Sequence, residues 1–285
     1  MATVFYNMAT LSYSGGEVNS NVVTGRLEEV LTLTKTAVSA GYAAGGTVSY
    51  AVSISNSGTE SFTGLTLEDD LGGYAFGTGT VYPLAYEAGS LRYYLDGVLQ
   101  PAPAVTAGPP MTVSGLTVPA GGSAMVLYEA RVTRYAPLAS ESTVVNTASV
   151  TGGGLTAPVT DTAEVGALGR PDLCISKSLS PTVVAENGRL TYTFVIQNSG
   201  NTAVTAADDL VLRDTFNPVL RDITVTFNGT AWTEGTEYTY SPADGKFATV
   251  AGRLTVPAGT FTQDPVTGAW SGEPGVSTLV ISGTV

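Results

Sequence analysis

The chain has 285 residues, 43% apolar and 13% charged, which is enough to bury the cores of two medium-sized domains. A net charge of −12 argues against nucleic acid as a partner, because phosphates select basic surfaces. The sequence has no histidine, so it lacks the commonest general base and metal ligand. The single cysteine, Cys174, excludes an internal disulfide and a cysteine-built metal site.

Turn-forming residues are abundant, with 34 glycines and 15 prolines among many Thr, Val and Ser. No segment shows a long helical period, and no apolar run is long enough for membrane insertion. The sequence therefore predicts an all-β protein of short strands. The opening MATVFYNMATLSYSGG lacks the basic and apolar regions of a secretory signal. This predicts retention in the cell or release by an unconventional route.

The first predicted strand lies in VFYNMATLSY, from Val4 to Tyr13. It matches VVNTASV, which follows the first of two internal copies at Val144 to Val150. Alternate residues of a strand share a face, and the matched face consists of Phe5, Asn7, Ala9 and Leu11 against Val144, Asn146, Ala148 and Val150. The chain therefore begins with a strand typical of the end of a domain.

Two copies of one unit make up the rest of the chain. LTLTKTAVSAGYAAGGTVSYAVSISNSGT, from Leu31, aligns with LCISKSLSPTVVAENGRLTYTFVIQNSGN, from Leu173. LTLEDDL and LTVPAG in copy one recur as LVLRDTF and LTVPAG in copy two. Each copy also contains a hairpin signal between these blocks, Asp96-Gly97 in the first and Asn228-Gly229 in the second. The repetition predicts tandem domains.

The alternating strands and frequent turns predict two tandem immunoglobulin-like β-sandwiches with an N-terminal donor strand. We expect a donor strand and linker over residues 1–25, a first domain over 26–168 and a second over 169–285. Copy two ends in STLVISGTV, without a counterpart of VVNTASV. The second domain is therefore predicted to lack its own last strand.

Three polar residues of copy one lie on the same face of their strands as the apolar residues predicted to point into the core. Lys35 follows Leu31 and Leu33, Asp69 follows Leu65 and Leu67, and Asn146 lies between Val144 and Ala148. In copy two the matching residues are Lys177 and Asp214, and the displaced strand supplies Asn7. Buried charges are costly unless they are paired, so each set should meet inside its domain.

A buried Lys–Asp–Asn cluster can form an isopeptide bond. Burial lowers the pKa of an amine and raises that of a carboxyl, so the neutral amine can attack the Asn carbonyl. The carboxylic acid can stabilise the developing charge and move protons to the departing ammonia. The alternative is a hydrogen-bonded cluster that only holds the two sheets together.

The motif order resembles the conserved repeat domain of bacterial surface proteins (domain of unknown function eleven) and the related isopeptide-forming domains of Gram-positive fimbrial subunits. The shared features are a first-strand Lys, a strand Tyr after a Gly, an Asn-x-Gly turn, an Asp near a strand end and a final Asn-x-Ala. The resemblance implies an intramolecular Lys35–Asn146 cross-link with Asp69 as its catalyst. Lys177 and Asp214 match in copy two. The missing secretory and sortase signals and the displaced strand depart from the family.

The displaced strand should fill an open groove, because an incomplete sandwich exposes a sheet edge and part of its core. The short connection from Ser20 to Leu31 makes closure within one chain unfavourable. We therefore expect insertion into a second copy, between its first strand and the strand ending at Val285. Head-to-tail contacts of this kind produce a homopolymer. Asn7 would then bond to the neighbour's Lys177, with Asp214 as catalyst.

The predicted function is a structural, self-assembling fibre subunit, pilus-like or spore-appendage-like, at an extracellular cell or spore surface. The alternative is a monomeric surface adhesin or binding module with a flexible N-terminal arm. An enzyme with turnover is not expected, because the sequence has no histidine or nucleophile motif, and no cofactor is implied. Asp69-Asp70 and Asp208-Asp209 are acidic pairs, but solvated turns are expected there rather than a calcium site, so no metal is predicted.

Overall fold

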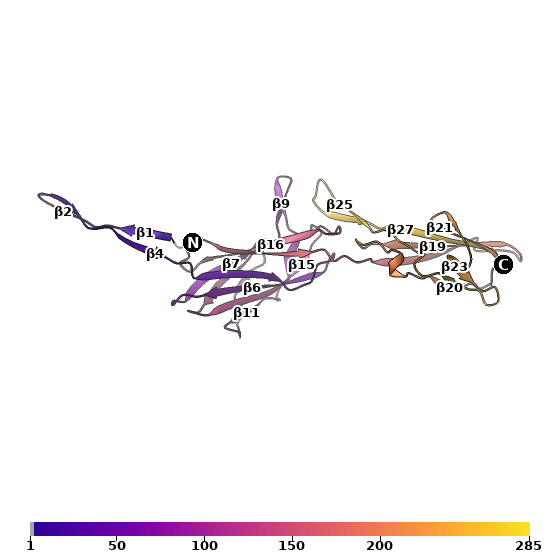
Figure 1. Cartoon of the computed structure of the whole chain (residues 1–285), viewed down its shortest axis with the longest axis horizontal. Coiled ribbons are helices and arrows are strands. Elements are labelled where there is room, and N and C mark those ends of the chain that lie inside the picture. Colours follow the sequence, from indigo (N-terminus) through magenta and orange to yellow (C-terminus); the bar gives the residue numbers. More distant parts are fainter. Residues whose placement is uncertain (1–2) are drawn as a thin grey trace.

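The computed structural model describes residues 3–285, which form β-strands and one short 3₁₀ turn, η1 (Ala206–Asp208). An N-terminal arm, a first domain and a second domain follow one another along the long axis (Figure 1). The all-β class predicted from the sequence is confirmed. Among the described residues, no helix has the length and apolarity needed to cross a lipid bilayer.

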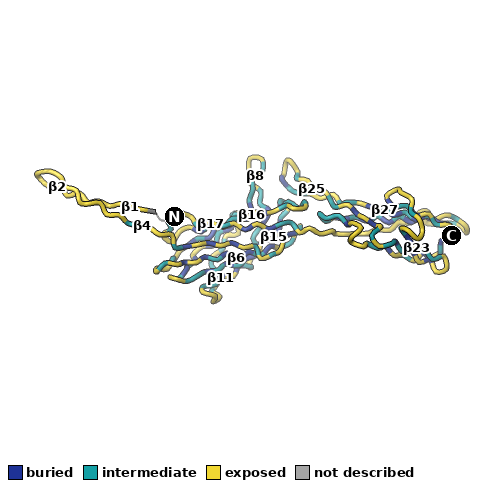
Figure 2. Tube along the Cα trace, viewed as in Figure 1, coloured by how far each residue is buried: buried dark blue, intermediate teal, exposed yellow. Residues whose placement is uncertain are grey.

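The arm is a long β-hairpin. Its outgoing half comprises β1 (Thr3–Asn7) and β2 (Thr10–Tyr13), and its returning half β3 (Gly16–Asn19) and β4 (Val23–Leu27). β1 pairs with β4 and β2 pairs with β3, both antiparallel. The arm points away from the second domain and is exposed along nearly its whole length (Figures 1 and 2). The structure differs here from the expectation of one strand and a linker, because residues 16–27 form two more strands.

The first domain is a sandwich of two antiparallel sheets. One sheet has the order β12 (Val98–Gln100), β11 (Arg92–Leu95), β15 (Ser123–Val132), β6 (Thr47–Asn56) and β5 (Leu31–Ala37), and β10 (Leu84–Tyr86) also pairs with β15. The other has the order β13 (Ala104–Thr106), β14 (Met111–Val118), β7 (Phe62–Asp69), β16 (Thr143–Gly152) and β17 (Val159–Gly166). Alternate residues of β6, including Tyr50 and Val52, face a closed core between the sheets.

The second domain repeats the first of these sheets. The order β18 (Leu173–Ser180), β19 (Arg189–Asn198), β27 (Gly275–Thr284), β21 (Arg221–Phe227) and β22 (Thr230–Trp232) corresponds to β5, β6, β15, β11 and β12. The facing sheet is smaller, with the order β20 (Arg213–Thr215), β24 (Lys246–Thr249) and β23 (Tyr238–Tyr240). Both predicted hairpin turns are confirmed, with positive φ at Asp96, Gly97, Asn228 and Gly229.

Two small hairpins connect the domains beside their linker. β8 (Tyr74–Phe76) and β9 (Gly79–Val81) project from the first domain, and β25 (Thr260–Gln263) and β26 (Trp270–Glu273) from the second. The Gln263 side-chain amide donates to the Tyr74 hydroxyl at 2.8 Å, and the Trp270 backbone N–H donates to the Arg134 carbonyl at 2.8 Å. The two domains are therefore connected at a second point in addition to the chain itself.

The expected insertion site of the displaced strand is wrong. In the second domain β19 already lies between β18 and β27 and pairs with both. Strand phase identifies which face of a strand is buried, but it does not reveal which strand lies beside it. The first domain shows where the matching strand lies, because β16 pairs with β7 in the opposite sheet.

Truncation of the chain to begin at Glu28 should leave the first domain folded. Its buried core runs from Leu31 to Val165 and includes no residue of the arm. We expect the free energy of unfolding of the first domain to change by less than about 0.5 kcal/mol, measured by urea denaturation. In contrast, Leu67→Ala in the centre of the core should cost about 2–5 kcal/mol. A loss of that size on truncation would mean that the arm supports the first domain.

Candidate functional site

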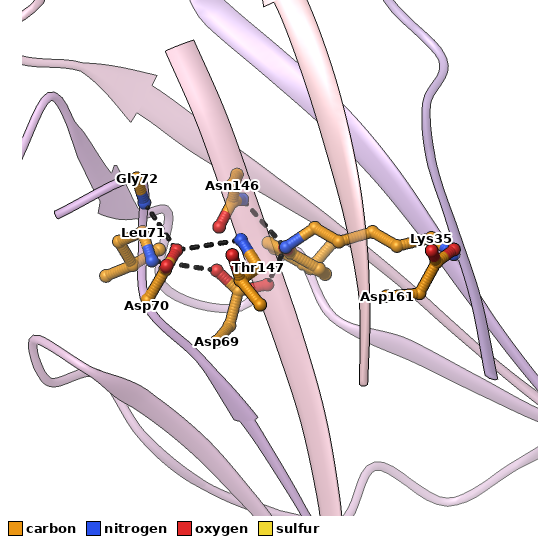
Figure 3. Close-up of polar contacts among 9 residues, drawn as sticks. Lys35, Asp69, Asp70, Leu71, Gly72, Asn146, Thr147 and Asp161 are labelled. Carbon is orange, nitrogen blue, oxygen red and sulfur yellow. Dashed lines mark hydrogen bonds and ion pairs between the residues drawn. The ribbon is translucent and has the colours of Figure 1, made fainter. Parts of the chain in front are cut away.

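The three predicted polar residues of the first domain meet between its two sheets. Lys35 comes from β5, Asp69 from the end of β7 and Asn146 from β16. The Lys35 amine donates to the Asp69 carboxylate. Figure 3 shows the lysine side chain extending across the domain toward Asp69 and Asn146. All three residues are buried, as their phase in the strands predicts.

A fourth residue, Tyr128 of β15, links the carboxylate to the amide. Its hydroxyl donates to Asp69 and accepts from the Asn146 side-chain amide at 3.4 Å. Tyr128 stacks on Tyr50, with ring centroids 5.5 Å apart, and the Lys35 amine lies 4.9 Å from the Tyr50 ring centroid. Tyr128 is not among the residues predicted from the sequence. Its core-facing phase in β15 was visible, but a buried tyrosine is typical of any core strand.

Burial dominates the electrostatics of the cluster. Desolvation lowers the pKa of the Lys35 amine, and the charge of Asp69 only partly opposes that shift. Burial, followed by the neighbouring Asp69 charge, raises the pKa of Tyr128 well above its ordinary value. Tyr128 therefore remains a protonated donor, while Lys35 loses its proton more readily than an exposed lysine.

The side-chain carbonyl oxygen of Asn146 accepts no hydrogen bond with good geometry from the described residues. Oδ1 of Asn146 and the hydroxyl of Tyr50 are buried, and neither makes a hydrogen bond with good geometry to any residue of 3–285. A buried polar atom without a partner costs about 1–3 kcal/mol. The amide is thus held through its nitrogen, while its carbonyl remains available to a donor in the cluster.

Backbone contacts fix the surroundings of the cluster. Asp69 Oδ1 accepts from the Leu71 N–H at 3.0 Å, and Asp161 Oδ2 of β17 accepts from the Lys35 N–H at 2.7 Å. Asp70 Oδ1 accepts from the Thr147 N–H at 2.9 Å, which connects the end of β7 to β16 (Figure 3). These carboxylates therefore have structural partners, and no group of three or more metal-ligating side chains occurs within residues 3–285.

The second domain repeats the lysine–aspartate pair in an open setting. The Lys177 amine lies 2.5 Å from Asp214 Oδ2, with the two side chains 39% and 19% exposed. The amine also lies 4.5 Å from the Tyr192 ring centroid. Ile281 replaces Tyr128 here, because it lies opposite Tyr192 as Tyr128 lies opposite Tyr50. The Asp–Tyr hydrogen bond of the first domain therefore has no counterpart at this site.

An apolar groove runs beside the second pair. Leu31 and Leu33 of β5 are 4% and 8% exposed, whereas their counterparts Leu173 and Ile175 are 40% and 55% exposed. A cavity of about 320 Å³ follows this face, and six of the residues that line it are Leu173, Ile175, Ile196, Leu210, Leu212 and Leu254. In the first domain the matching face of β5, with Leu31 and Leu33, is covered mainly by β17 and to a small extent by β16.

The edge of β20 beside the groove is also open. Asp214 of β20 lies opposite Phe247 of β24, as Asp69 lies opposite Met111 of β14. β7 has β16 on its other side, whereas β20 is the last strand of its sheet among the described residues. Asn7 lies in the arm at the opposite end of the molecule, so the structure does not bring it to Lys177 and Asp214 of its own chain (Figure 1).

No known protein family and no curated protein matches the sequence. Solved structures with a similar architecture include the major pilin subunit of Bacillus cereus, with 9% identity and a TM-score of 0.36, covering 95% of this chain and 73% of that one. The full-length pilus protein of Streptococcus pneumoniae has 12% identity and a TM-score of 0.34, covering 96% of this chain and 45% of that one.

The collagen-binding domain of a Staphylococcus aureus adhesin has 13% identity and a TM-score of 0.30, covering 48% of this chain and 98% of that one. A glycoside hydrolase and a transglutaminase match at similar scores. The chain spans about half the length of the two pneumococcal pilus structures.

Replacement of Tyr128 by phenylalanine should destabilise the first domain by about 1–3 kcal/mol, because the buried Asp69 loses a donor. Tyr50→Phe is the matched control. It removes the hydroxyl of the neighbouring ring, which lies near the Asn146 side chain but makes no hydrogen bond with good geometry. Because a buried hydroxyl without a good partner is itself costly, this change should be neutral or stabilising. Urea denaturation of both variants tests this, and equal costs would contradict the assigned hydrogen bonds.

Proposed function

We propose that the protein is a structural subunit of an extracellular fibre, pilus-like or spore-appendage-like, that polymerises head-to-tail. The arm of one molecule enters the groove in the second domain of the next. One observation carries this proposal: a single chain has both an open groove and an exposed arm whose sequence matches the strand that closes the same groove in the first domain.

The exposed apolar surface of both elements favours their association. Phe5 and Leu11 of the arm are 55% and 70% exposed, and the groove residues Leu173 and Ile175 are exposed as well. Burial of Phe5 and Leu11 would contribute roughly 1.5–3 kcal/mol each. The arm projects from one end of the molecule and the second domain forms the other (Figure 1), so such contacts do not close on themselves and extend into a filament.

The repeat sets the register of the junction. Alignment of the arm on β16 places Asn7 at the position of Asn146. In the first domain Ala148 lies opposite Asp69, so the matching residue Ala9 would lie opposite Asp214. Asn7 then faces the Lys177–Asp214 pair, and its insertion would complete a second Lys–Asp–Asn cluster across two molecules.

Each cluster is proposed to form an isopeptide bond in a single turnover. The lysine gives a proton to the aspartate, and the neutral amine attacks Cγ of the asparagine. The aspartic acid donates a hydrogen bond to the carbonyl oxygen and stabilises its developing charge. The new Nζ–Cγ bond replaces the Cγ–Nδ2 bond. Of the two protons that the lysine ammonium loses, one passes through the aspartate to Nδ2, which leaves as ammonia, and the other is released from the aspartate, which returns to its carboxylate form.

The bond within the first domain is tested by intact mass. Folded wild-type monomer should be lighter than its sequence mass by one ammonia, and Asp69→Ala should restore the full mass, because the amine loses its proton acceptor. Asp214→Ala is the matched control, since it leaves the first cluster unchanged and should retain the loss. A full mass in the folded wild type would contradict this bond.

The assembly is tested by electron microscopy and by gels run in hot detergent. Purified wild type should form filaments that give a covalent ladder. Asn7→Ala should still form filaments, because Phe5 and Leu11 remain, but these should dissolve to monomers in detergent. Asn146→Ala is the matched control, and it should retain the ladder.

A mixture of two variants tests the junction bond more sharply. When Lys177→Ala subunits are mixed with Asn7→Ala subunits, only an intact Asn7 meeting an intact Lys177 can react, so covalent products should stop at dimers. Longer ladders from this mixture would contradict the assigned pair of residues. Wild type that remains monomeric in solution would instead favour the adhesin alternative.

A further inference from the structure

We infer that the arm is donated as a complete hairpin, in which β1–β2 takes the place of β16 and β3–β4 takes the place of β17 along the neighbour's β18. The inference rests on the proposed head-to-tail assembly and extends it from one donated strand to two. It assigns a binding role to residues 16–27, which the sequence predicts as part of the donor strand and linker (residues 1–25) and the start of the first domain.

The first domain shows that one strand is not enough to close the sandwich. β16 pairs with β7, but β17 is the strand that lies alongside β5. Asp161 of β17 accepts from the Lys35 backbone N–H at 2.7 Å, and a bridge joins Tyr42 to Ala167 just beyond β17. Ala163 and Val165 of β17 are buried in the same core. Closure of the β5 side therefore depends on the returning strand of the hairpin.

The second domain has the same two open positions. The edge of β20 can accept one strand, as β7 accepts β16. β18 is exposed along nearly its whole length, whereas the inward residues of β5 are buried. A single donated strand at β20 would leave the far side of Leu173 and Ile175 in water, because β17 is what lies along β5 in the first domain.

At three of its four inward positions the arm has the pairing of the hairpin that it would replace. Residues directly opposite one another in a hairpin share a face. In the arm Asn7 lies opposite Val23, as Asn146 lies opposite Ala163 in the first domain. Two further inward pairs, Phe5 with Gly25 and Leu11 with Val18, match Val144 with Val165 and Val150 with Val159. Between these pairs the returning half of the arm contains one residue more than β17, next to the fourth inward residue, Ala9.

Size complementarity supports the match between Phe5 and Gly25. A side-chain carbon added at Gly25 would lie 2.2 Å from the Phe5 ring, so the ring already rests on this glycine in the free arm. In the arm a large side chain, Phe5, lies opposite a glycine, whereas the matching pair in the first domain consists of two valines, Val144 and Val165. Val18 and Val23 of the returning half are then available to cover Leu173 and Ile175.

A disulfide across the arm tests whether the hairpin inserts intact. Cysteines at Tyr6 and Thr24, which lie opposite each other on the outward face, are introduced into a Cys174→Ser chain. Tyr6 matches Val145, which remains exposed beside the closed first domain, so the bridge should not obstruct the groove. The oxidised variant should form filaments at a rate within about twofold of its reduced form.

Filaments from the reduced variant but not from the oxidised one would overturn the inference, because β1 would then have to separate from β4 before it enters the groove. Failure of the wild type to assemble would instead remove the proposed function on which the inference rests. The two failures are therefore distinguishable within one experiment.

A matched pair of substitutions tests the returning strand directly. Val23→Asp places a charge on the inward face of β4, and Thr24→Asp places the same charge on the outward face of the adjacent position. We expect Val23→Asp to weaken binding of the arm to an arm-truncated subunit by at least about tenfold, and Thr24→Asp to change it by less than about twofold. Equal effects would overturn the inference, because β4 would then lie outside the groove.

Discussion

The pairing of a lysine amine with an aspartate carboxylate at the face between the two sheets is the interaction that both domains share. In the first domain the chain itself supplies the strand that carries asparagine, and the cluster of Lys35, Asp69 and Asn146 is sealed between the two sheets. In the second domain the pair persists, but water reaches Lys177. The charge pair of the second domain is therefore partly solvated, and the apolar residues beside it, Leu173 and Ile175, remain exposed as well.

Strand phase and internal repetition were sufficient to predict that Lys35, Asp69 and Asn146 meet in the first domain and that Lys177 pairs with Asp214 in the second, because burial of every second residue is a local property. They were not sufficient to identify neighbours. The pairing of β16 with β7 joins segments far apart in the sequence, and nothing in VVNTASV specifies that partner. The returning half of the arm was missed because GEVNSNVVTGRL alternates poorly, and the two-residue turn at Ser14 and Gly15 is a weak signal.

The two clusters also differ in chemistry. Tyr128 holds both Asp69 and Asn146 in the first domain, whereas the matching Ile281 offers no hydroxyl to Asp214. A carboxylate held by a tyrosine donor loses part of its freedom to rotate and to accept a proton from the lysine. In the second domain Asp214 is held instead by the Lys177 amine and by the Thr215 backbone N–H at 2.9 Å. The first cluster is thus complete within its own domain, whereas the second domain contains only the lysine–aspartate pair.

The contact between the β25–β26 hairpin and the first domain has a mechanical consequence. Tyr74 and Arg134 bind this hairpin at a point beside the linker, so the two domains of one subunit are joined at two separated positions. Two attachment points resist bending far better than one. Between the arm and β5 only residues 28–30 connect the elements. A fibre of such subunits would therefore bend at residues 28–30, between one subunit's arm and its first domain, and would remain stiff across the two domains of each subunit.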